Sequence, residues 1–322
     1  MIDFRYHLVS LVSVFIALAI GVVLGAGPLR ESIGDTLTNQ VDALRQDKEN
    51  LQLAVGNRDE QIRQRDQFIS AVAPEIVAEQ LGGRTVVVVT TPDAGREAVD
   101  LLTDQVRAAG AEVTGRVNVT AAWADPEQQE FRRSLAGQLV PYLETPPDVG
   151  GGAGGDLAAV LAWAISAPDV GAAEEEDPNA ATVVEGLRGG NLITVDGDVT
   201  QRATLALVVT GAPEQPADDD AVAAAEEASA AWLPLVDALD QRAAGTVVAG
   251  PLEAAAPGGL LTLLRADETA EGTSTTDAAD TPAGRVVAVW ALREQLAGDA
   301  GHYGFGEGAQ ALLPDVAAPS DQ

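Results

Sequence analysis

Residues 8–26 form one uncharged segment, LVSLVSVFIALAIGVVLGA, and no other feature of the sequence constrains the fold as strongly. A helix of these 19 residues, at about 1.5 Å per residue, would be roughly 28 Å long, close to the hydrocarbon thickness of a bilayer. One alternative is a cleaved signal peptide, because residues 17–19 resemble a cleavage site; another is a helix buried in a soluble core. The apolar run continues past residue 19, and Arg5 and Arg30 flank it. The sequence therefore predicts an uncleaved transmembrane anchor within residues 1–30.

The charges around this segment predict its orientation. Arg5, His7 and the α-amino group precede it, whereas Arg30 on the other side is offset by Glu31. By the positive-inside rule, the N-terminus is expected in the cytoplasm and the bulk of the chain is expected to be exported, as a single-pass protein of the cell membrane. Small residues recur at every fourth position of the segment, which allows two such helices to pack closely in lipid. These are Ser13, Ala17, Gly21 and Gly25.

Residues 31–78 carry a heptad repeat that is typical of a coiled coil. β-Branched residues at position a and leucine at the first d positions favour two parallel strands, and the polar residues Lys48, Arg58 and Arg65 would restrict the register. We therefore expect a parallel homodimeric stalk whose helix ends at Pro74. A single amphipathic helix docked on its own domain is the alternative. The predicted interface consists of Leu37, Val41, Leu44, Lys48, Leu51, Val55, Ile62, Ile69 and Val72.

Residues 79–322 alternate short apolar, β-branched runs with helical patterns. This alternation predicts an α/β domain with a mostly parallel, Rossmann-like sheet covered on both faces. Thr281 is expected to cap the last helix, in which Pro282 occupies the first turn and Gly298 marks the end. The expected strands are 84–89, 113–119, 191–195, 204–210, 246–249 and 260–265. One expected helix runs from the turn at 91–93 to residue 109, and the others are 127–139, 157–165, 221–241 and 282–297. The expected loops or tails are 145–156, 167–180, 212–220, 266–280 and 314–322.

The composition excludes several kinds of chemistry. The chain has no cysteine, one methionine and a net charge of −30, from 19 Lys and Arg against 49 Asp and Glu. Thiol, zinc-finger and iron–sulfur chemistry are therefore excluded, and nucleic acid is not an expected partner. No dinucleotide-binding fingerprint follows a predicted strand, and no P-loop or nucleophile-elbow motif occurs. We expect no enzyme activity, no catalytic residue and no bound cofactor, and we interpret the acidic runs at 174–177 and 218–220 as solvated charge.

The most distinctive stretch of the domain is GHYGFG at residues 301–306, in a chain whose aromatic content is only 4%. Glycines let a backbone approach a ligand or partner closely, and the rings would supply contact area. The alternative is a tight turn whose aromatic side chains cover the edge of the sheet. The candidate ligand or partner residues are Gly301, His302, Tyr303 and Gly304.

Three stretches together resemble a known family. MIDFRYHLVSLVSVFIALAIGVVLGAGPL, LRADETAEGTSTTDAADTPAGRVVAVWALREQLAG and GHYG are similar to the actinobacterial MctB family, copper transport proteins of the mycobacterial outer envelope. Corynebacterial members named SteB are associated with septation. The resemblance implies a role in copper efflux or resistance, including pore formation and association with the outer membrane. Alternatively, it implies a non-enzymatic dimeric scaffold of a cell-division complex with an envelope or septation partner.

The residues favour the scaffold more directly than the pore. Each chain has one hydrophobic span, whereas a pore needs a closed barrel or several helices. Copper(I) prefers Cys and Met ligands and copper(II) prefers His, but the chain has no cysteine, one methionine and two distant histidines. Copper is therefore expected at most as a transported ion, with no metal ligand that can be assigned. The residues by themselves predict a tethered dimer that displays an α/β domain.

Overall fold

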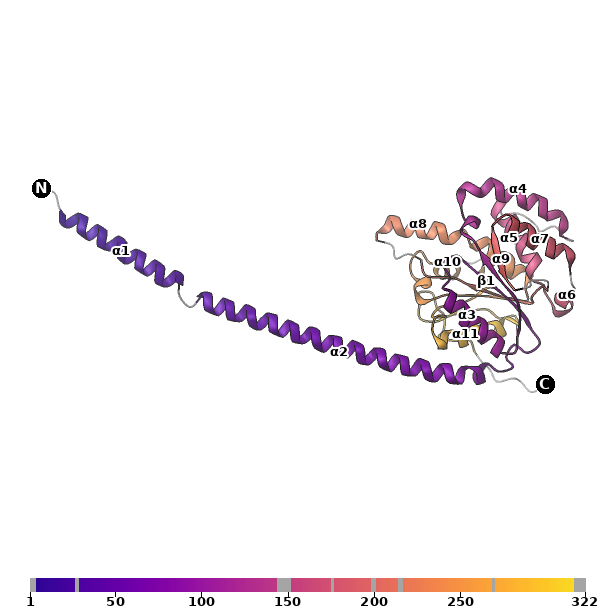
Figure 1. Ribbon diagram of the computed structural model, residues 1–322, viewed down its shortest axis with the longest axis horizontal. Coiled ribbons are helices and arrows are strands. Elements are labelled where there is room, and N and C mark those ends of the chain that lie inside the picture. Colours follow the sequence, from indigo (N-terminus) through magenta and orange to yellow (C-terminus); the bar gives the residue numbers. More distant parts are fainter. Residues whose placement is uncertain are drawn as a thin grey trace. The chain divides into compact units, whose positions relative to one another are not determined.

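The computed structural model describes residues 4–26, 29–143, 152–174, 177–197, 201–213, 217–267 and 270–315, without the side chains of residues 24, 26, 29–38, 152–154 and 174. The chain divides into two compact units, residues 1–65 and residues 66–322. The first unit contains helix α1 and most of helix α2. The second contains the end of α2 and an α/β domain, and the helices of both units are labelled in Figure 1.

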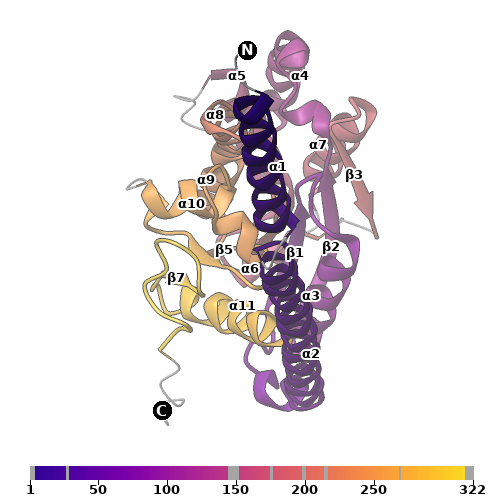
Figure 2. The ribbon, with the colours of Figure 1, turned by 90° about the vertical axis from the view of Figure 1, so that its left-hand side faces the viewer.

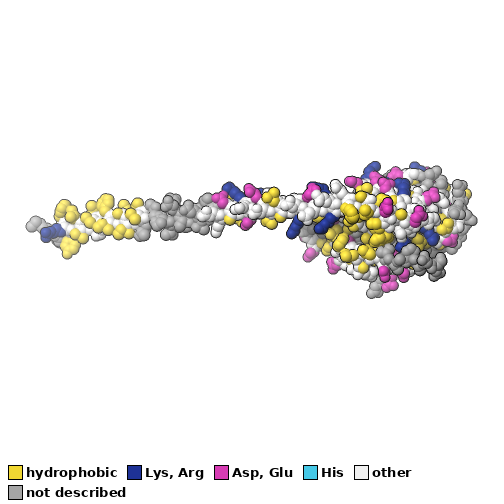
Figure 3. Space-filling view, turned by 90° about the horizontal axis from the view of Figure 1, so that it is seen from below, with side chains coloured by type: hydrophobic (Ala, Val, Ile, Leu, Met, Phe, Trp, Pro, Cys, Tyr) yellow, Lys and Arg dark blue, Asp and Glu magenta, His cyan; other side chains and the backbone are white. Residues whose placement is uncertain are grey.

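Helix α1, Phe4–Ala26, contains the uncharged segment. Its span Phe4–Val23 has a mean hydropathy of 2.3, and none of it is buried inside the chain. Figure 3 shows apolar side chains along this helix, followed by mixed acidic and basic ones along α2. The hydroxyl of Ser13 donates to the carbonyl oxygen of Val9 at 2.8 Å, so it is satisfied within the helix. The predicted apolar N-terminal helix is confirmed, with the length and composition that a membrane crossing needs.

Helix α2, Leu29–Val77, continues through Pro74, where the sequence predicts its end. A proline inside a helix removes one hydrogen bond and costs about 3 kcal/mol. The last turn nevertheless packs on the domain, where Ala73, Val77 and the following Leu81 are at most 2% exposed. Burial of these side chains offsets the cost, and the helix ends one turn later than expected.

The described residues of the second unit form a seven-stranded sheet in the order β3-β2-β1-β4-β5-β6-β7. All neighbouring pairs are parallel except β2 with β3, so the predicted mostly parallel sheet is confirmed. Figure 2 shows β3 and β2 on one side of β1, with β5 and β7 on the other. The strands are β1 Thr85–Thr90, β2 Glu112–Val119, β3 Ile193–Asp196, β4 Leu205–Val209, β5 Gly245–Ala249, β6 Ser274–Thr276 and β7 His302–Tyr303.

Helices cover both faces of this sheet, because successive side chains of its central strands are buried on opposite sides. In β1, Val86 and Val88 pack against α3, α11 and the end of α2, whereas Val87 and Val89 pack into the core lined by α4, α5, α7, α9 and α10. Figure 1 shows these two helical layers with the sheet between them. The helices are α3 Arg96–Ala108, α4 Gln129–Leu139, α5 Gly152–Ile165, α6 Val170–Glu174, α7 Pro178–Gly189, α8 Asp219–Ala230, α9 Leu233–Arg242, α10 Leu260–Ala266 and α11 Pro282–Gln295, with short 3₁₀ turns at Ala121–Trp123, Pro126–Gln128, Val140–Tyr142 and Leu252–Ala255.

Several sequence predictions are wrong in this region. Residues 260–265, expected as a strand, form α10, in which Leu260, Leu261 and Leu264 share one buried face at helical spacing. The helix expected over 221–241 is interrupted after Ala230, because Pro234 has no N–H to donate to the carbonyl of that residue, and it restarts as α9.

The loop expected over 167–180 contains α6 and the start of α7. Asp177 caps α7 by accepting from the backbone N–H of Asn179 at 2.8 Å, and Pro178 occupies its first turn. The loop expected over 266–280 contains β6, which is only three residues long. The final helix agrees with its predicted start, since Thr281 Oγ1 accepts from the N–H of Gly284 at 3.0 Å.

Candidate functional site

The glycine-rich stretch at residues 301–306 lies at one edge of the sheet. His302 and Tyr303 form β7, which pairs in parallel with Thr275 and Thr276 of β6. The Tyr303 ring is buried in the core on the α11 side, and its hydroxyl donates to a carboxylate oxygen of Glu294. Burial and the negative charge of Glu294 raise the pKa of Tyr303 above its ordinary value. Tyr303 thus stays a neutral donor that ties the edge strand to α11.

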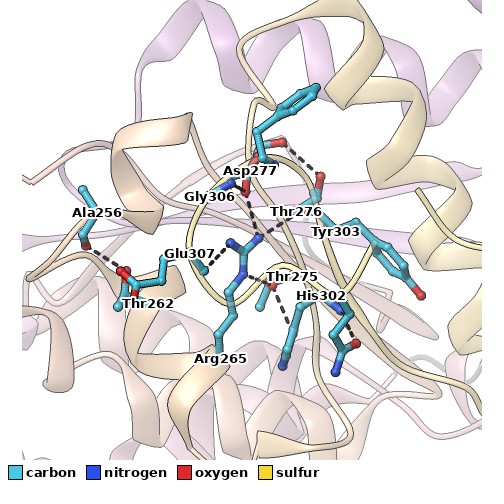
Figure 4. Close-up of polar contacts among 12 residues, drawn as sticks. Ala256, Thr262, Arg265, Thr275, Thr276, Asp277, His302, Tyr303, Gly306 and Glu307 are labelled. Atoms are coloured by element: carbon cyan, nitrogen blue, oxygen red, sulfur yellow. Dashed lines mark hydrogen bonds and ion pairs between the residues drawn. The ribbon is translucent and has the colours of Figure 1, made fainter. Parts of the chain in front are cut away.

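Beneath this loop lies a buried ion pair. Arg265 of α10 and Asp277, the residue after β6, are joined at 3.0 Å, and their side chains are 1% and 0% exposed. The guanidinium also donates to Thr275 Oγ1 at 3.0 Å, to the carbonyl of Tyr303 at 2.9 Å and to that of Glu307 at 3.0 Å. Figure 4 shows Arg265 at the centre of these contacts, with the loop folded around it. A charge this deeply buried is tolerable because it is paired and each of its three nitrogens has a hydrogen-bond partner.

The Asp277 carboxylate fixes the backbone of the loop. It accepts from the N–H of Phe305 and from the N–H of Gly306, both at 2.8 Å. Gly304 has φ +128°, a conformation that favours glycine, and a Cβ there would lie 2.0 Å from Asp277 Oδ1. The glycine therefore lets the backbone close over the carboxylate, which a side chain would prevent.

His302 completes the cluster, with Nδ1 3.1 Å from Thr275 Oγ1. Burial, and secondarily the positive charge of Arg265, lower the pKa of His302 below its ordinary value of 6.5. The imidazole is therefore neutral at neutral pH. The polar groups of the predicted loop bind the ion pair, Thr275 and Glu294, which accounts for its unusual composition by folding alone. Its role as a ligand or partner site stays a prediction.

A second candidate site lies at the carboxyl ends of the central strands. The chain adds β2 on one side of β1, and β4 later joins β1 on its other side. The order in which strands are added to the sheet therefore reverses between β1 and β4. Ligands of open α/β sheets bind in the crevice outside such a reversal. Here that position holds a crevice of about 630 Å³, lined by Pro92, Asp93, Thr210, Gly211, Pro213, Ala217, Ala221, Ala224, Ala225, Ala228, Ser229, Trp232 and Leu260.

The floor of this crevice is made by the loops after β1 and β4. Thr91 Oγ1 donates to Asp93 Oδ1 and lies 3.3 Å from Thr210 Oγ1. A Cβ on Gly211 would lie 2.0 Å from the carbonyl oxygen of Asp93, so the two loops meet backbone to backbone. A smaller cavity of about 250 Å³ shares Asp93, Thr210 and Gly211 with the crevice and extends past Gly250 to Asp280.

The described residues include no group of three or more His, Cys, Asp or Glu side chains placed to hold one metal ion. Asp93 and Asp280 are carboxylates near the two cavities, and the acidic residues 218–220 begin α8 rather than converge on a common point. The N-cap Asp218 accepts from the N–H of Ala221 at 2.9 Å, a helix-capping role.

The predicted packing residues of α1 and α2 lie along single helices. The four small residues of α1 are exposed along it. On α2 the apolar side chains of the predicted interface are also exposed, from 38% at Val41 to 68% at Leu44, and so is Lys48. Ile69 and Val72, nearer the domain, are half-buried, and the side chain of Leu37 lies outside the described residues. The last turns of α2, through Ala73 and Val77, pack on the α/β domain.

Sequence reasoning missed Arg265, Asp277 and the crevice. The sequence pattern predicts a strand at Arg265 and a loop at Asp277, so nothing in it indicates that the two residues meet. The available signal was a lone arginine in an apolar helix and an aspartate directly after the buried run Ser274–Thr276. The crevice had no signal, because its walls come from alanines and prolines that no motif marks.

Residues 1–314 match the family described as copper transport outer membrane protein, MctB. The chain is 31% identical to the copper transporter MctB of Mycobacterium bovis and to that of Mycobacterium tuberculosis, over 97% of this chain and 99% of each relative. It is 32% identical to the copper transporter MctB of Mycobacterium leprae, with the same coverage. These matches extend over both units and over the loop at 301–306. The chain therefore belongs to the MctB copper transport family.

Proposed function

We propose that this protein contributes to copper efflux as a membrane-anchored, parallel homodimer, and that it acts by binding rather than by catalysis. The observation that carries the proposal is the row of apolar side chains on α2 that the chain itself leaves uncovered. Family membership supports the copper role, and the exposed apolar helix α1 supports the anchor.

The exposed row has the spacing of a coiled-coil seam. Leu44 and Leu51 at d positions are 68% and 66% exposed, and Val55 and Ile62 at a positions are 56% and 53% exposed. Fully burying side chains of this size stabilises by about 1.5–3 kcal/mol each, so pairing two such helices would supply a large driving force. β-Branched residues at a with leucine at d favour two parallel strands.

The anchor supports the same arrangement. Two α1 helices inserted in the same orientation bring their α2 helices out of the bilayer in parallel. The ridge of Ser13, Ala17, Gly21 and Gly25 would let the two spans pack closely. The N-terminus is then cytoplasmic, and the α/β domain is exported.

Copper is the cargo in this proposal, and no resident metal site is part of it. Each chain contributes one candidate span among its described residues, so a conducting pore would have to be an assembly of several chains or include a partner. The dimer would hold the α/β domains where such an assembly forms.

A matched pair of substitutions tests the dimer. Leu51 and Leu53 are 66% and 68% exposed on the same helix, but Leu51 falls at position d of the heptad and Leu53 at position f, on the outer face. Leu51→Asp should dissociate the full-length protein in a mild non-ionic detergent, as measured by light scattering, whereas Leu53→Asp should leave it dimeric. Equal behaviour of the two variants would contradict the seam.

Because the chain has no cysteine, single cysteines also report on the seam without a background. Val41→Cys or Val55→Cys should cross-link to the same position of a second chain in cells, and Leu53→Cys should not.

The copper role is tested in a deletion strain, by measuring growth on copper and cell-associated copper. Wild-type protein and Leu53→Asp should restore resistance, and Leu51→Asp should not. Unchanged copper content together with abnormal septa in the deletion strain would instead support the alternative, a scaffold of a division complex.

A further inference from the structure

We propose that the crevice between α8 and the loop after β1 binds a small organic cation with an apolar body. The inference rests on the second unit alone and does not depend on the copper role. The crevice of about 630 Å³ lies within the usual range for small-molecule sites, and it occupies the position where open α/β sheets bind their ligands. Its chemistry, however, differs from that of a nucleotide site.

The walls of the crevice are apolar and made of small side chains. One face of α8 presents Ala221, Ala224, Ala225 and Ala228, and no residue of this helix is buried. Trp232 and Leu260 also line the crevice. Alanine leaves the space that larger side chains would fill, so the volume between α8 and the sheet stays open to an apolar ligand.

The charged residues that line the crevice and the adjoining cavity are aspartates, and the nearest cation at Asp280, Arg285, donates to its backbone carbonyl at 2.8 Å from outside the lining. Asp93 lies in its floor, Asp280 lies in the adjoining cavity, and residues 218–220 begin the helix that forms its wall. Among the described lining residues of both cavities there is no Lys, Arg or His. Phosphate and carboxylate ligands would therefore be repelled, whereas a cation would be attracted to Asp93. The indole of Trp232 adds a face on which an ammonium group can stack.

The floor that carries Asp93 is closely packed. The backbone of Gly211 lies against the backbone of Asp93, and a Cβ on Gly250 would lie 2.9 Å from both Ala254 Cβ and Thr210 Cγ2. Thr91 Oγ1 donates to one carboxylate oxygen of Asp93. This hydrogen bond orients the carboxylate and leaves its other oxygen to pair with a ligand in the crevice.

The test uses three matched probes on the full-length protein in a non-ionic detergent. Benzyltrimethylammonium, benzyl alcohol and benzoate share a ring and differ in charge. Binding is measured by equilibrium dialysis and by the fluorescence of Trp232, with Trp232→Phe to assign the signal. We expect benzyltrimethylammonium to bind at one site per chain, at least about tenfold more tightly than benzoate.

Two variants locate the site. Asp93→Asn should weaken binding of the cation about tenfold and leave benzyl alcohol unchanged. Ala224→Phe should fill the crevice and abolish binding of both. Glu226→Gln, which removes an exposed carboxylate from α8 outside the lining, should change neither. Equal binding of the cation and benzoate, or binding that survives Ala224→Phe in a protein with unchanged circular dichroism, would overturn the proposal.

Discussion

Replacing Arg265 with methionine tests whether the buried ion pair holds the C-terminal edge of the sheet. The side chains of Arg265 and Asp277 are 1% and 0% exposed, so removal of the arginine leaves a buried carboxylate without its countercharge. Breaking a buried pair in this way costs about 3–5 kcal/mol. Two backbone N–H groups still donate to Asp277, so we expect the lower end, about 3 kcal/mol. In a unit of this size, that corresponds to a decrease of roughly 10 °C in Tm.

The assay is urea denaturation of the full-length protein in a non-ionic detergent, followed by tryptophan fluorescence. This signal reports on the second unit, because all four tryptophans lie there, at Trp123, Trp163, Trp232 and Trp290. The control is Arg188→Met, which removes a pair with Glu185 whose side chains are 47% and 67% exposed, and which should cost at most about 1 kcal/mol. If Arg265→Met costs no more than Arg188→Met, the reasoning about the buried pair is refuted.

Three further predictions concern the same edge of the sheet and α9. Gly304→Ala should lower the free energy of unfolding by more than about 2 kcal/mol, because the residue has a positive φ and its Cβ would meet the Asp277 carboxylate. Gly298 also has a positive φ, +86°, but a Cβ there would have nothing within 4 Å. Gly298→Ala should therefore cost only about 1 kcal/mol in the same titration. His302 has a lowered pKa in the folded protein, so below pH about 6.5 the unfolded chain binds a proton more readily than the folded one. The free energy of unfolding should therefore fall as the pH drops from about 6.5 through the lower pKa. His302→Gln should remove this pH dependence. Burial raises the pKa of Asp240, so its ionisation should reduce the free energy of unfolding as the pH rises from 3.8 through the raised pKa. Asp240→Asn should therefore unfold at a higher urea concentration than wild type at pH 7. A lower urea midpoint for this variant would count against the assignment.

The two N-terminal helices and the central strands of the fold were predictable because their signals are local. An uncharged run that includes Leu8 and Leu18 has to be helical where water is absent, and a run such as Thr85–Thr90 is too short and too β-branched for a surface helix. The short strands β6 and β7 carry no such signal. β6 becomes a strand by pairing with the edge of β5, and β7 becomes a strand by pairing with β6.

The candidate sites depended on tertiary structure to a greater degree. The composition of residues 301–306 marked the loop as unusual, but the reason for it lies in Arg265 and Asp277, which are 12 residues apart in sequence and meet only when α10 packs beside β6. The crevice depends on the reversal of strand order between β1 and β4, and sequence patterns alone do not reveal the strand order.

The sequence by itself determined the apolar N-terminal helix, the long polar helix after it and an alternating α/β domain, because hydrophobic periodicity acts over one or two turns of chain. Tertiary structure alone decided that α2 runs through Pro74 and that residues 260–265 form a helix rather than a strand. It also decided where the buried charges meet. In each of these cases, the burial of side chains from distant segments outweighs a local preference of a few kcal/mol, and such burial exists only in the folded chain.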